Sequence, residues 1–390
     1  MEILPEVNPL AQSSSRVEAI DALTSMTGST SRNTRGTTRS IVVRVHVEKS
    51  DKMPVRIAAE YDAPIGKNVC KLVNQIGHGF TLSPHDTALF VQRFSNGITL
   101  ILLYVDDMII TGDDSIDVRF LQHFLSQHFE MKDLGSLSYF LGLKVISSSE
   151  GYYLSQAKYA SDLLSKASIT NNKTISTPLE YSAKLTPLDG EPISDATSYC
   201  QLVGSLIYFT ITRPDISHAV GMVNKFMDAP HSVHYASILW ILRYVKDTLC
   251  HGLYYSSRSS LEFHAYSNVN WVGDPTDRCS ITDFCFLFGT SLVSWRSKKQ
   301  DVVSHSSTEV EYHALADTTC ELVRLHWLLA DMDASQPTAT PLYCDNRSAI
   351  YITRKDVFHE RTKHIEIDRH INRQHLKKGN LKLFSISSIE

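Results

Sequence analysis

Two neighbouring carboxylates, Asp106 and Asp107, stand between two apolar runs in the stretch LILLYVDDMIITGDD. The runs predict two strands of a β-hairpin with the acids at its tip. Asp is a common turn residue, so a purely structural role is one interpretation. The other is metal binding, because adjacent carboxylates repel each other unless a cation neutralises them. Magnesium is the natural candidate, since it prefers carboxylate oxygens combined with substrate phosphates.

The composition of the whole chain is ordinary for a globular protein, and its 390 residues predict two or three domains. The net charge of −4 excludes no class of partner. Seven Cys without a CxxC pair favour a reducing compartment and argue against a zinc site or a disulfide framework. No signal pattern and no apolar run of roughly 18–20 residues is present. We therefore expect a soluble intracellular protein that does not bind membranes.

The distribution of apolar residues divides the chain into four parts. Residues 1–55 have no apolar period and are Ser/Thr/Gly/Arg-rich in part, which predicts disorder or a linker. Two hairpins and two amphipathic helices are expected between 90 and 168. Residues 196–250 are expected to be helical, with breaks at Pro214 and Pro230. From Leu261 onward strands alternate with helices, which predicts a compact α/β domain. Within it we expect a hairpin with Gly289-Thr290 at its turn and a long helix opened by a capping box from Ser306 to Glu309.

Several motifs in one order resemble the Pol polyprotein of copia-type LTR retrotransposons, in the form found in plants. YVDDMIITG resembles the catalytic hairpin of a reverse transcriptase, and DLGSLSYFLGLKV and GYYLSQAKYASDLL follow it. SSTEVEYHALA, YCDNRSAI and RTKHIEIDRHI then resemble a ribonuclease H domain. The resemblance extends from about Asn68 to the C-terminus.

This resemblance implies α+β and α/β domains in chain order. They are a partial reverse-transcriptase palm with an antiparallel sheet and helices (56–170), a mostly helical connection (171–258), and a ribonuclease H-like mixed sheet with helices (259–390). An unmatched segment (1–55) precedes them. The resemblance also implies magnesium as cofactor and an RNA/DNA hybrid or template-primer as partner. The implied catalytic positions are Asp106, Asp107, Glu311, Asp345, Glu366 (with Asp368 as its alternative) and the altered position Asn268. Of these, the implied metal ligands are Asp106, Asp107, Glu311 and Asp345.

The palm departs from the family pattern in two ways. The family has a third carboxylate in an Asp-Val-Lys-x-Ala-Phe-Leu segment before the hairpin, and Asp62 lacks that context. The family's Tyr-Gly-Leu-Lys-Gln block, part of the nucleotide pocket, is missing after VCKL. We therefore expect Asp106 and Asp107 to lack their chemical partners, and we expect no DNA polymerisation.

The ribonuclease H-like part departs at one motif, where the family's Tyr-Ser-Asp-Ala-Asp-Trp reads YSNVNW. Asn268 and Asn270 are neutral amides that cannot supply the charge that holds a divalent cation. We therefore expect a domain that folds without cutting. The departures from the family pattern replace Asp by Asn, Arg by Cys, Thr by Ile, Gly by Asp and Ala by Val. Each corresponds to a single C-to-T or G-to-A change in the gene, so we hypothesise that the chain comes from a silenced, decaying copy of a retrotransposon.

Basic residues suggest contacts with nucleic acid. Between Arg354 and Lys382 there are nine Lys or Arg against four acids, which indicates either a solvated surface or a phosphate-binding one. The expected nucleic-acid contacts are Arg296, Lys298, Lys299, Lys363 and His364. Two functions remain open: a polymerase and ribonuclease H relative with little activity, or a non-catalytic nucleic-acid-binding or host-recruited protein.

Overall fold

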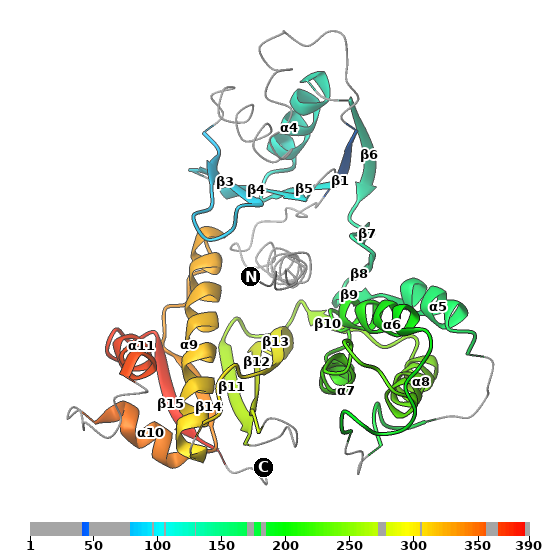
Figure 1. Ribbon diagram of the computed structural model, residues 1–390. Helices are drawn as coiled ribbons and strands as arrows, with labels where there is room; N and C mark the ends of the chain where they lie inside the picture. Colours follow the sequence, from blue (N-terminus) through cyan, green and yellow to red (C-terminus); the bar gives the residue numbers. More distant parts are fainter. Residues whose placement is uncertain are drawn as a thin grey trace, which may run out of the picture. The chain divides into compact units, whose positions relative to one another are not determined.

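The computed structural model describes residues 41–46, 79–95, 97–104, 107–128, 130–169, 175–180, 185–271, 278–304, 306–355 and 366–386. These residues belong to two compact units, which are treated separately below. Figure 1 labels their elements. Antiparallel and mixed sheets occur together with helices, as expected. In these ranges no helix is long and apolar enough to cross a membrane.

The first unit contains a six-stranded antiparallel sheet in the order β2-β3-β4-β5-β1-β6. The strands are β1 (Ile41–His46), β2 (Thr81–Leu82), β3 (Leu89–Phe94), β4 (Gly97–Tyr104), β5 (Asp107–Gly112) and β6 (Glu130–Ser136). Helix α4 (Ser115–His128) buries Val118, Leu121 and Leu125 against apolar side chains of β3, β4 and β5. The predicted hairpin is confirmed, because β4 pairs with β5 and Tyr104 lies opposite Asp107. A short hairpin of β7 (Tyr139–Phe140) and β8 (Leu143–Ser148) follows.

Strand β1 corrects one expectation from the sequence. Residues 1–55 were expected to be disordered or a linker, yet Ile41–His46 form a strand between β5 and β6. The local sequence IVVRVH is rich in β-branched residues, which suit a pleated strand. Its pairing partners lie more than 60 residues away, so no local signal could have placed it.

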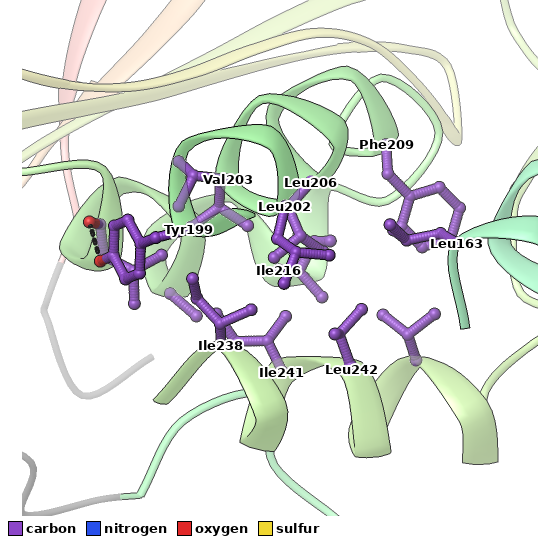
Figure 2. Packing of buried hydrophobic residues seen from close by; sticks show 14 of the residues in the cluster. Leu163, Tyr199, Leu202, Val203, Leu206, Phe209, Ile216, Ile238, Ile241 and Leu242 are labelled. Carbon is purple, nitrogen blue, oxygen red and sulfur yellow. Dashed lines mark hydrogen bonds between the residues drawn. The ribbon is translucent and has the colours of Figure 1, made fainter. Parts of the chain in front are cut away.

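The helical part of the second unit packs around one apolar core (Figure 2). Its helices are α5 (Ala157–Lys166), α6 (Ala196–Phe209), α7 (Ser217–Asn224) and α8 (Ser232–Asp247). Asp195 caps α6 by accepting a hydrogen bond from the Ser198 backbone N–H at 2.9 Å. The predicted break at Pro214 is confirmed, since a short 3₁₀ turn, Pro214–Ile216, separates α6 from α7. Strands β9 (Gly151–Ser155) and β10 (Leu253–Ser256) lie beside each other.

The same unit contains a mixed five-stranded sheet in the order β13-β12-β11-β14-β15. Three strands are antiparallel, and the parallel pairs are β11 with β14 and β14 with β15. Their bounds are β11 (Phe263–Asn270), β12 (Ile281–Phe288), β13 (Ser291–Lys299), β14 (Thr340–Cys344) and β15 (Leu381–Ser385). The helices are α9 (Ser307–Asp331), of which this unit includes the part up to Val323, α10 (Arg347–Arg354) and α11 (Glu366–Lys377). The predicted turn at Gly289 is confirmed, and its φ of +59° suits glycine.

Candidate functional site

Two parallel strands bring the first site residues together. β11 and β14 pair in parallel, with Ser267 opposite Cys344. The next residues along the chain are Asn268, within β11, and Asp345, just past the end of β14, so their backbones lie at the same end of this strand pair. Asn346 then caps α10, since its Oδ1 accepts from the Ala349 N–H at 3.0 Å. The motif YCDN therefore ends a strand, presents an acid and begins a helix.

Helix α9 supplies a second carboxylate to this edge. The Ser306 hydroxyl accepts from the Glu309 N–H at 3.2 Å, which confirms the predicted N-terminal cap. Seven residues beyond Glu311, the Thr318 hydroxyl donates to Ser267 Oγ at 3.1 Å and so ties the helix to β11. Glu311, on the same face, is 5% exposed. One donor atom each from Glu311, Cys344 and Asp345 lie within 4.8 Å of one another.

The surroundings of Glu311 disfavour the charged form of its side chain. Burial, followed by the negative charge of Asp345, raises the pKa of Glu311 to about 8. Burial likewise raises the pKa of the Cys344 thiol to about 12. The thiol donates to Glu311 Oε2 at 3.9 Å and accepts from the Asn346 N–H at 3.4 Å. Among the described residues, Glu311 therefore interacts with an acid and a thiol and with no positive charge.

The donor set suits one magnesium ion, held by Glu311 and Asp345 and completed by water or phosphate oxygens. It does not suit a pair of ions, because the adjoining strand β11 offers the exposed, uncharged Asn268 after Ser267. The two candidates for the last acid occupy different environments. Glu366 is exposed at the start of α11, whereas Asp368 is half-buried and forms a hydrogen bond with His313 on α9.

His313 was not singled out in the sequence, and its signal was only its helical spacing from Glu309. The ring stands 4.0 Å from Glu309, and the bond to Asp368, opposed by burial, raises the pKa of His313. A second contact between the same helices is the Thr319 hydroxyl, which donates to Asn372 at 2.8 Å. Together these contacts hold α11, and with it Asp368, against α9.

The expected phosphate contacts fall into three groups. Arg296 and Lys298 are exposed and alternate along β13, so both side chains leave the same face of the sheet, whereas Lys299 is half-buried. Lys363 and His364 lie outside the described residues. In the C-terminal basic run, three guanidinium groups donate to backbone carbonyls. They are Arg354 to Leu383, and Arg369 and Arg373 both to Lys355.

The acid pair of the hairpin is described only in part. Asp106 lies outside the described residues, and Asp107 is 9% exposed at the start of β5. The neighbouring strand is β1, with Arg44 in register opposite Asp107. The sequence of β1, IVVRVH, contains no carboxylate. The strand beside the predicted catalytic hairpin therefore supplies no further acid.

Comparison with known proteins agrees with these observations. A family model described as reverse transcriptase (RNA-dependent DNA polymerase) matches residues 60–181. The chain is 38% identical over 310 residues to a retrovirus-related Pol polyprotein from transposon RE2 of Arabidopsis thaliana, covering 80% of this chain and 21% of that protein. It is 37% identical over 319 residues to the one from transposon TNT 1-94 of Nicotiana tabacum, covering 78% and 24%.

A putative transposon Ty5-1 protein of Saccharomyces cerevisiae is 31% identical over 247 residues, covering 63% of this chain and 80% of that protein. The chain belongs to the family of copia-type retrotransposon Pol polyproteins, as its motifs predicted. It spans about a fifth of the length of the first Pol polyproteins that it matches, RE2 and RE1.

Proposed function

We propose that this chain is a nucleic-acid-binding piece of a retrotransposon Pol polyprotein whose polymerase and ribonuclease H chemistry is lost or severely impaired. Its ligand would be an RNA/DNA hybrid or template-primer. The observation that carries the proposal is the neutral Asn268 on β11, one residue beyond Ser267, whose strand partner Cys344 immediately precedes Asp345.

Phosphodiester hydrolysis in such a site depends on how many carboxylates share the metal charge. Bound magnesium would polarise the scissile phosphate and make water a better nucleophile. In this chain Glu311 and Asp345 would hold one ion, and His313 would orient Asp368 toward α9. The amide of Asn268 can coordinate through oxygen but adds no charge. Losing one ligand charge should cost several kcal/mol of transition-state stabilisation. Each ~1.4 kcal/mol slows the reaction about tenfold, so the rate of hydrolysis should fall by several powers of ten.

The palm supports the same conclusion for polymerisation. Asp107 begins β5, and the adjoining strand β1 contributes only apolar and basic residues. Nucleotidyl transfer by two ions needs carboxylates that bridge both of them. We propose that the palm retains its hairpin without its chemistry.

Binding would use the exposed cations of β13. Arg296 and Lys298 project from one face with two-residue spacing, which suits successive contacts along a phosphate backbone. This observation also favours the second candidate function, a non-catalytic nucleic-acid-binding or host-recruited protein. The two candidate functions differ in whether restoring the lost acid can restore cleavage of the hybrid.

The test compares the full chain with Asn268→Asp on a labelled RNA–DNA hybrid in magnesium. We expect the unchanged chain to bind in a salt-sensitive manner without measurable cleavage, and Asn268→Asp to cut. Asn268→Asp combined with Glu311→Ala is the matched control and should be inactive. Cleavage by the unchanged chain that disappears in Glu311→Ala would refute the loss of activity. If Asn268→Asp binds the hybrid without cutting it, the purely binding function is favoured.

The binding surface is tested by replacing Arg296 and Lys298 together with Ala. The binding constant K falls as salt rises, and each lost phosphate contact should make the slope of log K against log salt shallower by about 0.7–0.9. The double replacement should therefore make the slope shallower by about 1.5. Replacing Arg369 and Arg373 is the comparison, because their guanidinium groups already donate to the Lys355 carbonyl. An unchanged slope in the β13 variant would exclude this surface.

A further inference from the structure

Strand β13, which carries the cations assigned above to phosphate binding, is fixed against helix α9 by two hydrogen bonds. The Ser294 hydroxyl donates to Glu321 Oε1 at 2.9 Å. Gln300, just past the end of the strand, donates through Nε2 to the Val310 carbonyl at 3.2 Å. Residue numbers rise along β13 as they fall along α9, so the two elements run in opposite directions.

The spacing along both elements places Asp317 of α9 beside these cations. Alternate residues of a strand share one face, so Arg296 and Lys298 lie on the same side of β13 as Ser294. Arg296 is about 6.6 Å along the strand from Ser294. Asp317 is one turn before Glu321 on the same face of α9, about 6 Å along the helix. Arg296 and Asp317 therefore stand at the same level, between the two hydrogen bonds.

The electrostatics of Asp317 agree with this placement. Neighbouring protein atoms partly desolvate the carboxylate and raise the pKa of Asp317, whereas the positive charges of Arg296 and Lys298 lower it. Two other charged groups act on it: Asp368 of α11 raises the pKa, and His313, one turn earlier on α9, lowers it. Asp317, Arg296 and Lys298 are all exposed, so a ligand can reach them.

From this arrangement we propose that Asp317 is an internal counter-ion, which competes with nucleic-acid phosphates for Arg296 and Lys298 and so limits the strength of hybrid binding. The inference rests on the proposed function. A phosphate that approaches the two cations meets charges that Asp317 already partly neutralises, and the same carboxylate repels it. Removing this acid should therefore strengthen binding.

The test compares the full chain with Asp317→Asn on the labelled RNA–DNA hybrid, in low salt without magnesium. A unit charge roughly 8 Å from a phosphate near a protein surface should change the binding constant about threefold to tenfold, so Asp317→Asn should bind more tightly by this factor. Asp317→Glu keeps the charge and should bind like the unchanged chain. Glu262→Gln, which removes an exposed charge just before β11, is the matched control and should also change little.

The gain should depend on the cations of β13. When Arg296→Ala and Lys298→Ala are already present, adding Asp317→Asn should raise the affinity by less than about twofold. A carboxylate NMR titration without the hybrid gives a second measurement, in which replacing the two cations should raise the pKa of Asp317. A purely structural role for Asp317 would produce neither result.

Three results would overturn the inference: no tighter binding by Asp317→Asn, an equal gain with and without the β13 cations, or a pKa of Asp317 that is indifferent to their replacement. Salt-sensitive binding by the unchanged chain with no gain in Asp317→Asn would refute this inference and leave the proposed function intact. Absence of hybrid binding in the unchanged chain and in Asp317→Asn would refute both.

Discussion

Arg213 and Asp215 form an ion pair with two hydrogen bonds in the helical part, and we predict that its loss loosens that part. Arg213 is 1% exposed and donates to both Asp215 oxygens, at 2.9 and 2.7 Å. It also donates to the Thr248 carbonyl at 3.0 Å and hydroxyl at 2.6 Å. Its guanidinium carbon stands 5.5 Å from the Phe209 ring centre and 5.6 Å from that of Tyr244. Asp215→Ala would leave the buried guanidinium of Arg213 with hydrogen bonds to Thr248 and without its carboxylate partner.

The magnitude follows from the two bonds removed. Charge-assisted hydrogen bonds contribute about 1.5–3 kcal/mol each, which gives about 3–6 kcal/mol for the pair. The Asp215 side chain is 35% exposed, so solvent screens part of this interaction, and we expect about 2–3 kcal/mol. Burial alone would raise the pKa of Asp215, but the bonds to Arg213 lower it. This contribution is therefore present above the unfolded pKa and is lost as the pH falls through the lowered folded pKa.

The assay is native-state hydrogen exchange of the amides of α7 and α8, because a chain of several units need not unfold in one step. Tyr244→Phe is the matched control, since it removes one hydrogen bond to Asp215 Oδ2 and leaves the ring under Arg213. It should cost about 1 kcal/mol. Exchange in Asp215→Ala that is no faster than in Tyr244→Phe would refute the reasoning.

Two further predictions concern the same unit. His234 is fully buried, with Nδ1 accepting from the His231 N–H at 3.0 Å and Nε2 facing the Thr186 carbonyl at 2.9 Å; burial lowers its pKa. The neutral form of His234 is the one that these bonds and its burial favour, so the free energy of unfolding should fall as the pH drops below about 6.5. Urea unfolding at several pH values should show a weaker dependence on pH in His234→Gln. Gly252→Ala should destabilise by about 1–3 kcal/mol, because the new Cβ would stand 2.1 Å from the Leu154 carbonyl oxygen. Gly204→Ala in α6, which meets open space, should stabilise by up to about 1 kcal/mol, and equal unfolding midpoints for the two variants would contradict this account.

Local signals in the sequence predicted most elements of the fold. The cap at Ser306, the turn at Gly289 and the break at Pro214 depend on residues within a few positions of one another, and all three are confirmed. Strand β1 was missed because its pairing partners are distant in sequence. Strand β15, a short strand last in the order of its sheet, was missed for the same reason, because it pairs in parallel with β14, which lies before α10 and α11 in the sequence.

The residues of the candidate site were likewise predicted from the sequence only in part. The motifs named Glu311, Asp345 and Glu366, with Asp368 as the alternative to Glu366. These two positions are about 200° apart around α11, so only the packing of that helix decides which one meets α9. The structure places Asp368 beside His313 and leaves Glu366 exposed.

The sequence by itself determined the family of this protein, the kinds of side chain available for chemistry and the neutral amide at Asn268. Only the tertiary structure brought the thiol of Cys344 to Glu311. Consecutive residues of a continuing strand point to opposite faces, so Cys344 and Asp345 would diverge if β14 went on. The strand ends at Cys344 and Asn346 starts a helix, which allows thiol and carboxylate to meet the same buried Glu311. Burial and charge at that meeting point depend on α9 and on the end of β14, which are distant in the sequence, so no short stretch contains both.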